Sequence, residues 1–243
     1  MRVKIVISYD GTNYCGWQIQ PNGTSVQKIL EDALFEITGE KTKIKGSGRT
    51  DAGVHSLGQV AHFDTNRSIP AKNFYRAFNI HLPDDIKVLS SEEVDKDFNA
   101  CSSAKKKTYR YSTYVSPTIL PLKERFSIQL KRQPDLEKMR ECAKLFIGEH
   151  DFKCMTASGS GAKTTVRTIF EINIVQKEQD LDFFVCGNGF LYNMVRIMIG
   201  TLIAVGNGKI NEKDVEQMLS TQKRNLGGKT LVAKGLTLMS VEY

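Results

Sequence analysis

The residues best suited to chemistry gather in one short segment, residues 46–55, which reads Gly-Ser-Gly-Arg-Thr-Asp-Ala-Gly-Val-His. Its glycines allow the backbone to come close to a bound partner. Asp51 lies between Arg49 and His55, and cationic neighbours favour the ionised form of a carboxyl group. Asp51 is therefore a candidate nucleophile or general base. The alternative is an Asp-Ala-Gly turn in which the Asp51 side chain only bonds nearby backbone.

A second candidate is Arg196, the one charged residue of the apolar segment 191–205. Burying an unpaired cation costs several kcal/mol, so we expect Arg196 to face a carboxylate, which its planar fork suits better than an ammonium would. We predict Asp51 as this partner, because the pair would keep the carboxylate charged and fix its orientation. Alternatively, Arg196 lies on a narrow polar stripe and reaches water.

A third candidate is a basic and aromatic strand, residues 105–111, which reads Lys-Lys-Lys-Thr-Tyr-Arg-Tyr. In a strand, Tyr109 and Tyr111 share one face and Arg110 lies on the other. Cations that bind phosphate beside an aromatic face are typical of proteins that hold single-stranded or flipped nucleotides. Alternatively, the tyrosines belong to an ordinary core and the lysines are simply solvated.

Three glycine-rich segments look like nucleotide-binding motifs but fail on spacing. Residues 158–164 and 227–230 lack the leading glycine of a phosphate loop, and residues 46–48 have Asp51 where the dinucleotide motif needs its third glycine. We interpret the first two as surface loops.

Composition places the chain among globular proteins. It has 243 residues, 40% of them hydrophobic, and 34 Lys and Arg against 27 Asp and Glu, a net charge of +7 that permits a nucleic-acid partner without requiring one. We expect no membrane span and no secretory signal, because no apolar stretch is long enough. Five scattered cysteines and four histidines without ligand spacing predict reduced thiols, a cytoplasmic location and no metal.

Hydrophobic periodicity predicts two α+β halves, residues 1–98 and 99–243. In the first half we expect strands over residues 3–7, 43–45, 59–63 and 86–89 and helices over residues 24–39 and 73–78. In the second half we expect strands over residues 108–115, 126–130, 166–175, 182–186 and 236–241 and helices over residues 135–146, 190–205 and 212–219. The order of the first half is that of a ferredoxin-like unit.

The segment 48–55, followed by Gln59-Val60, resembles the catalytic motif of the TruA family of tRNA pseudouridine synthases. The resemblance extends over nearly the whole chain. Its other matching segments are residues 9–11, 16–18, 25–27, 79, 82–83, 85–86, 107–111, 166–169, 190–200 and 235–236.

The resemblance implies roles for particular residues. Asp51 would be the catalytic aspartate and Arg196 its partner, Tyr109 would stack on the target uracil, and Arg49 would help to hold the flipped nucleotide. The residues expected to contact RNA are His55, Lys105, Lys106, Lys107, Arg110 and Arg167.

The resemblance also implies an architecture and a substrate. The fold would be two ferredoxin-like α/β halves that share an extended antiparallel sheet with helices on one face and an active cleft between the halves. The protein would act as a homodimer on the anticodon stem-loop of tRNA, isomerising uridines 38, 39 and 40 with neither cofactor nor metal.

Two places depart from the family pattern. Cys101 stands where an Arg that should meet RNA is usual, and the proline expected near Leu231-Val232 is missing. Neither departure affects Asp51, Tyr109 or Arg196, so the chemistry is still expected. The alternatives are the same chemistry on another tRNA position or on ribosomal RNA, a non-catalytic RNA-binding module, and a nucleotide hydrolase built on residues 159–164.

Overall fold

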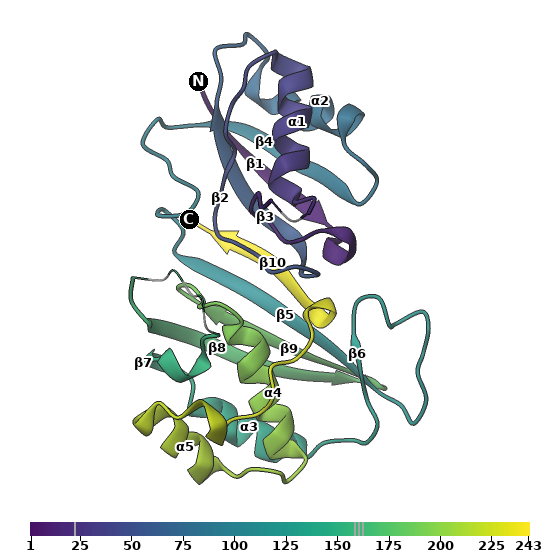
Figure 1. Ribbon diagram of the computed structural model, residues 1–243, viewed down its shortest axis with the longest axis vertical. Helices are drawn as coiled ribbons and strands as arrows, with labels where there is room; N and C mark the ends of the chain where they lie inside the picture. Colours follow the sequence, from purple (N-terminus) through teal and green to yellow (C-terminus); the bar gives the residue numbers. More distant parts are fainter. Residues whose placement is uncertain (22, 158, 160, 162) are drawn as a thin grey trace. The chain divides into compact units, whose positions relative to one another are not determined.

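The computed structural model describes residues 1–21, 23–157, 159, 161 and 163–243. The chain divides into two compact units: unit 1 comprises residues 1–105 and 237–243, and unit 2 comprises residues 106–236. Each unit combines helices with a sheet, which confirms the expected α+β class (Figure 1). The sequence analysis divides the chain after residue 98; the compact units divide after Lys105, and the final residues belong to unit 1.

Unit 1 contains strands β1 (Arg2–Tyr9), β2 (Lys45–Gly46), β3 (His55–Asp64), β4 (Ile86–Val94) and β10 (Leu236–Glu242), and helices α1 (Val26–Thr38) and α2 (Phe74–His81). Its strand order is β4-β1-β3-β10, and β2 pairs with β3. The pairs of β1 with β3 and β4 are antiparallel, whereas β10 runs parallel to β3 through Thr237–His55 and Leu238–Ser56. The pairs of β1 agree with the extended antiparallel sheet that the resemblance implies. The parallel pair is an exception, and local periodicity cannot detect it because it joins strands far apart in sequence.

The core of unit 1 lies on one face of this sheet. Burial alternates along β1, so that Val3, Ile5, Ile7 and finally Tyr9 point into the core. They pack in one cluster with residues of α1 and α2, which therefore cover the same face: Val26, Leu30, Ala33, Leu34, Phe74 and Phe78. The Ser25 side chain accepts a hydrogen bond from the Lys28 N–H and caps the start of α1.

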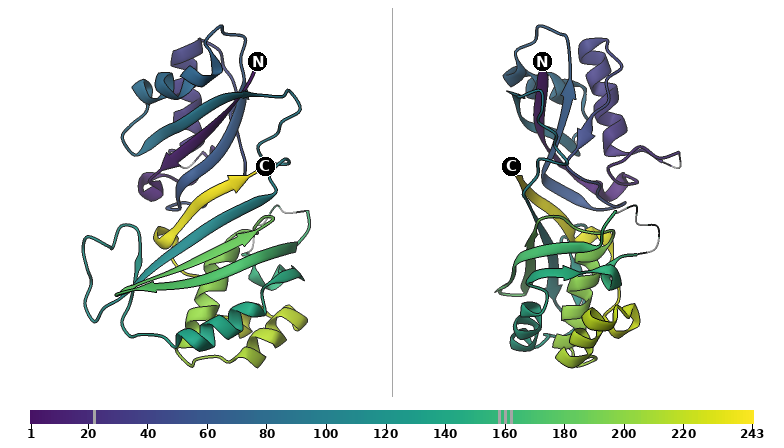
Figure 2. Two further views of the ribbon diagram at one scale, coloured as in Figure 1. Left: turned by 180° about the vertical axis from the view of Figure 1, so that it is seen from behind. Right: turned by 90° about the vertical axis from the view of Figure 1, so that its left-hand side faces the viewer.

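Unit 2 contains strands β5 (Lys106–Val115), β6 (Ile128–Leu130), β7 (Gly148–Asp151), β8 (Val166–Lys177) and β9 (Asp180–Gly187), and helices α3 (Leu136–Lys144), α4 (Met194–Gly206) and α5 (Glu212–Thr221). The order β5-β9-β8-β7 is antiparallel throughout, and β6 pairs parallel to β5 (Figure 2). The sequence analysis missed β7, which is short and polar. It also began α4 too early, since Asn193 has a left-handed backbone (φ 63°).

Helix α4 packs directly on the backbone of residues 227–231. A Cβ atom on Gly200 would lie 1.9 Å from the Lys229 carbonyl oxygen, and one on Gly228 would lie 2.2 Å from the Gly200 carbonyl oxygen. The Gly228 N–H donates to the Thr201 hydroxyl at 3.0 Å. The glycines in 227–230, which resemble a phosphate loop in the sequence, are thus explained by close packing against a helix.

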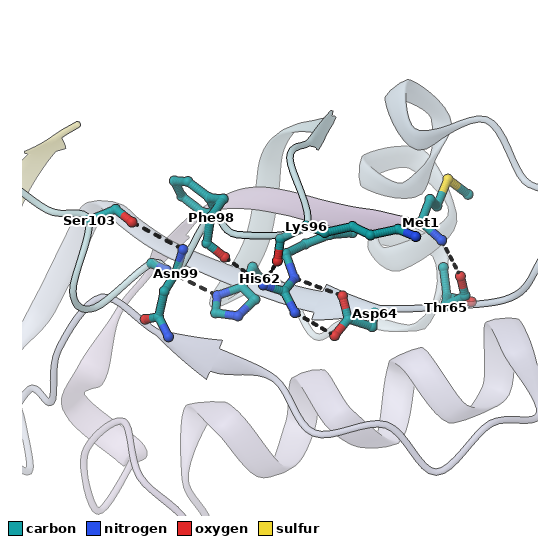
Figure 3. A network of polar contacts seen from close by, with 10 residues as sticks. Met1, His62, Asp64, Thr65, Lys96, Phe98, Asn99 and Ser103 are labelled. Atoms are coloured by element: carbon teal, nitrogen blue, oxygen red, sulfur yellow. Dashed lines mark hydrogen bonds and ion pairs between the residues drawn. The ribbon is translucent and has the colours of Figure 1, made fainter.

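A polar network fixes the chain that follows β4 to the sheet of unit 1 (Figure 3). The Arg2 guanidinium donates two 2.8 Å hydrogen bonds to the Asp64 carboxylate and one of 2.8 Å to the Phe98 carbonyl. Buried His62 accepts a hydrogen bond from the Ala100 N–H on Nδ1 at 3.1 Å, and its ring meets the Phe98 ring edge-on. Burial lowers the pKa of His62, and the positive charge of Arg2 lowers it further.

His62 makes the stability of the protein depend on pH. Its pKa is lower in the folded protein than the ordinary value of 6.5, so the unfolded chain takes up the proton first as the pH falls through that value. The free energy of unfolding therefore decreases below about pH 6.5. We expect His62→Gln to reduce this decrease, as measured by urea unfolding between about pH 7.5 and 5.5. His81→Gln, which removes an exposed histidine from α2, is the matched control; an unchanged pH slope in His62→Gln would contradict the assignment.

Gly200→Ala tests the packing of α4. The added methyl group collides with the Lys229 carbonyl, so we expect a loss of about 1–3 kcal/mol in the free energy of unfolding. Gly189→Ala is the control, because its Cβ would lie no closer than 3.6 Å to the flexible Arg167 side chain. Thermal and urea unfolding compare the two, and equal stability would show that residues 227–231 move aside at no cost.

Candidate active site

The candidate catalytic segment, residues 46–55, leads from β2 into β3 in unit 1. The Ser47 N–H donates to the Val60 carbonyl at 2.7 Å, and the Val54 N–H donates to the Asp51 carbonyl at 3.1 Å. The first bond ties the start of the segment to the sheet and the second closes a turn at Asp51. Arg49 is exposed. The backbone that carries Asp51 is therefore bonded on both sides.

The loop that follows β1 lies against this segment at distances that exclude side chains. A Cβ atom on Gly11 would lie 2.0 Å from the Val54 carbonyl oxygen, and one on Gly16 would lie 2.5 Å from the Thr50 carbonyl oxygen. Gly16 also has a φ of 102°, which other residues rarely adopt. The Trp17 N–H donates to the same Thr50 carbonyl at 3.1 Å. The sequence analysis matched these residues to the family without finding their role, which is to support the segment.

A buried layer of polar side chains lies beneath the segment, and we call it the support layer: Tyr9, Ser47, Thr50 and Gln59. The hydroxyls of Tyr9 and Thr50 are 2.8 Å apart and hydrogen-bonded. Gln59 accepts from the Ser47 hydroxyl at 2.6 Å and donates to the Gly48 carbonyl at 3.0 Å. The sequence analysis included Tyr9 and Ser47 in the segments it singled out but assigned neither a supporting role, because their spacing is that of ordinary strand and turn residues.

His55 is buried, with 3% of its surface exposed. Its Nδ1 atom lies 3.0 Å from both the Gly11 nitrogen and an Asp10 carboxylate oxygen. Without a proton, Nδ1 accepts a hydrogen bond from the Gly11 N–H, whereas a protonated Nδ1 donates to the Asp10 carboxylate. This position supports the loop after β1, and a contact between His55 and RNA stays a prediction.

In unit 2 the two tyrosines of β5 have different environments. Tyr111 is fully buried, and its hydroxyl donates to the Val232 carbonyl at 2.7 Å, so it belongs to the core. Tyr109, on the same face, is only partly buried. Its ring meets the Phe190 ring edge-on, with centroids 5.2 Å apart. Phe190 thus fixes the orientation of Tyr109, a role that the sequence analysis did not assign.

Arg196 lies in the first turn of α4 and is held from two sides. Its Nε donates to the Leu231 carbonyl at 2.6 Å and its Nη1 donates to the Asn193 side chain. The Leu231 N–H donates in turn to the Arg196 carbonyl at 3.3 Å. Leu231 belongs to the stretch that departs from the family pattern, but it contacts Arg196 through its backbone. The departure therefore leaves the support of Arg196 intact.

The other predicted cations are spread over both units. Lys105 is exposed in unit 1, and Lys106 is exposed with its Nζ 5.9 Å from the Phe170 ring centroid. Arg110 lies on the face of β5 opposite Tyr109, and its Nε is buried without a hydrogen-bond partner among the described residues. Lys107 is half-buried. The Arg167 guanidinium donates to the Thr164 and Val166 carbonyls. Their contacts with RNA stay predictions.

The described residues contain neither a cluster of metal ligands nor a membrane-spanning helix. No three His, Cys, Asp or Glu side chains among them gather as a metal site requires. The described helices include none with the length and apolar character needed to cross a membrane. The segment 158–164 lies partly outside the described residues.

The chain is similar to known proteins along almost all of its length. The family model described as tRNA pseudouridine synthase matches residues 5–101 and 142–243. tRNA pseudouridine synthase A of Acetivibrio thermocellus is 46% identical over 241 residues, which cover 99% of each chain. The proteins of that name from Clostridium botulinum and an Exiguobacterium species are 45% and 42% identical, and each match covers at least 98% of both chains. These matches confirm the resemblance carried by residues 48–55, and the chain belongs to the tRNA pseudouridine synthase family.

Proposed function

We propose that this protein isomerises uridine to pseudouridine in tRNA, with Asp51 as the catalytic carboxylate. The observation that carries the proposal is the construction of residues 46–55. Asp51, the aspartate proposed to be catalytic, lies on a turn whose backbone is bonded to the sheet, to the loop after β1 and to the support layer. Such a preorganised carboxylate suits a reaction that requires precise placement.

The reaction rearranges bonds without gain or loss of atoms. The bond between uracil N1 and ribose C1′ breaks and a bond between C5 and C1′ forms, while C5 loses a proton and N1 gains one. A carboxylate can act as the nucleophile at C1′ or C6, or as the base that removes the C2′ proton to give a glycal. Each of these three routes uses Asp51 in its ionised form.

Residues around Asp51 and in unit 2 have proposed supporting roles. The target base must leave its stack, which costs a few kcal/mol, and stacking on Tyr109 would offset part of that cost. The edge-on contact with Phe190 holds the Tyr109 ring in place for this role. Arg49 would hold the flipped nucleotide, and Arg196 would keep the catalytic carboxylate ionised.

The substrate position and assembly rest on the family resemblance. We propose uridines 38, 39 and 40 of the anticodon stem-loop as targets, a homodimer as the active form and the cytoplasm as the location. The name that the relatives share, tRNA pseudouridine synthase A, supports tRNA as the substrate class. The cations Lys105, Lys106, Lys107, Arg110 and Arg167 would supply phosphate contacts.

Asp51→Asn tests the catalytic assignment. The change is nearly isosteric but removes the charge, so we expect pseudouridine formation to fall by at least about 10²-fold while tRNA affinity stays within a few-fold. Release of tritium from C5-labelled uridine in tRNA measures turnover, and filter binding measures affinity. Asp32→Asn, on the exposed face of α1, is the control. Wild-type turnover in Asp51→Asn would make the catalytic assignment wrong.

The substrate proposal is tested by mapping pseudouridine in cells with and without the gene, using carbodiimide treatment and primer extension. Loss confined to tRNA positions 38 to 40 supports the whole proposal. Loss at another tRNA or ribosomal position keeps the chemistry and changes the substrate. No loss, together with inactivity of the purified protein on tRNA, favours a non-catalytic RNA-binding module.

Arg196→Ala should reduce both turnover and stability. It removes the hydrogen bonds that the half-buried guanidinium donates to Leu231 and Asn193, so we expect about 1–3 kcal/mol less free energy of unfolding. Arg196→Lys should restore only part, because one ammonium cannot reproduce the planar fork that reaches both Leu231 and Asn193. Single-turnover rates and urea unfolding measure the two effects. Arg140→Ala, which changes an exposed residue of α3, is the control. Full activity and stability in Arg196→Ala would favour the alternative that the Arg196 side chain only reaches water.

A further inference from the structure

Tyr9 occupies the point where the core of unit 1 reaches the catalytic turn. It continues the buried face of β1 after Val3, Ile5 and Ile7, and only 4% of its surface is exposed. The ring packs near Trp17, with centroids 6.3 Å apart, and only the hydroxyl departs from the apolar pattern. A phenylalanine would fill the same space. The hydroxyl therefore needs an explanation of its own, and it lies 2.8 Å from the Thr50 hydroxyl.

We propose that Tyr9 is a positioning residue for the isomerisation, whose hydroxyl holds Thr50 and thereby fixes Asp51, the next residue in the chain. The inference rests on the proposed role of Asp51. It assigns to Tyr9 no contact with substrate.

Thr50 is the residue through which the position of Asp51 is controlled. Its side chain is held by Tyr9, and its carbonyl accepts from the Trp17 N–H at 3.1 Å. Gly16 lies against the same carbonyl without room for a Cβ atom. A trans peptide bond holds consecutive Cα atoms about 3.8 Å apart, so fixing residue 50 restricts where residue 51 can lie.

Gln59 extends the same support to the start of the segment. It is fully buried, accepts from the Ser47 hydroxyl and donates to the Gly48 carbonyl. Burial raises the pKa of the Tyr9 phenol, and the nearby Gln59 side chain opposes part of that increase. The support layer thus holds the segment at two places: Tyr9 holds Thr50, next to the proposed catalytic residue, and Gln59 holds Ser47 and Gly48.

The Tyr9 hydroxyl is suited to holding a position rather than to transferring protons. Burial raises the pKa of Tyr9 far above the ordinary value of 10, so the phenol stays neutral at any pH at which the protein works. Its hydroxyl is already bonded inside the protein. Removing it should therefore change the rate of the chemical step without changing the shape of its pH profile.

The test compares Tyr9→Phe with Tyr243→Phe. Both remove one tyrosine hydroxyl from a 2.8 Å hydrogen bond in unit 1, the second to the Ala100 carbonyl away from the segment. We expect Tyr9→Phe to lower the single-turnover rate of tritium release from C5-labelled tRNA by about tenfold or more, because small misplacement of a reacting group costs this much. Its tRNA affinity should stay within about threefold. Tyr243→Phe should keep the wild-type rate.

A double-mutant cycle with Thr50 separates positioning from a general loss of stability. Thr50→Val removes the partner hydroxyl and Thr50→Ser keeps it, so Thr50→Ser should retain far more activity. Adding Tyr9→Phe to Thr50→Val should lower the rate no further, because both changes remove the same hydrogen bond.

Three results would overturn the inference: a wild-type rate in Tyr9→Phe, an equal loss in Tyr243→Phe, or rate losses that multiply in the double variant. Asp51→Asn is measured alongside. If Asp51→Asn is inactive and Tyr9→Phe is fully active, the positioning role alone fails. If Asp51→Asn turns over normally, the proposed function fails and the inference fails with it.

Discussion

The close approach of two backbones is the constraint on which the candidate site depends. Gly11 and Gly16 bring the loop after β1 against residues 50–54 with no room for a single methyl group between them. At that separation the N–H and carbonyl groups of the two loops bond directly to each other, so the turn carrying Asp51 is built from main-chain bonds. Side chains add the layer beneath, in which the hydroxyl of Tyr9 and the amide of Gln59 replace apolar atoms.

In unit 2, main-chain groups likewise hold the side chain of Arg196. The guanidinium of Arg196 is oriented by the Leu231 carbonyl, and the segment that carries this carbonyl lies on α4 because Gly200 and Gly228 have no side chains. Asn193 completes the arrangement with its side-chain oxygen. In both units, therefore, the residues proposed to take part in the reaction, Asp51 and Arg196, are held by groups that are not themselves reactive. Those groups set the geometry on which a carboxylate or a guanidinium depends.

Sequence reasoning predicted most helices and strands and proposed which residues react, but it did not identify the residues that support them. Alternation along Val3, Ile5 and Ile7 predicts β1 and its buried face because strand periodicity is local. The parallel pairing of β10 with β3 lies beyond such reasoning, since it joins distant parts of the chain. The bond between Tyr9 and Thr50 spans 41 residues, and neither partner has an unusual residue type for its position. The type of a residue indicates which chemistry its side chain can perform. Which residues surround it depends on the complete fold.

The contact between Arg196 and Leu231 has a consequence for how this sequence can change over time. A carbonyl oxygen is present whatever side chain the residue bears, so position 231 is free to vary while the arginine keeps its ligand. The same freedom does not extend to positions 200 and 228, where any side chain would separate the helix from the segment. Substitutions should therefore be tolerated at position 231 and rejected at positions 200 and 228, so that the side chain at 231 can change while the path of the backbone is retained.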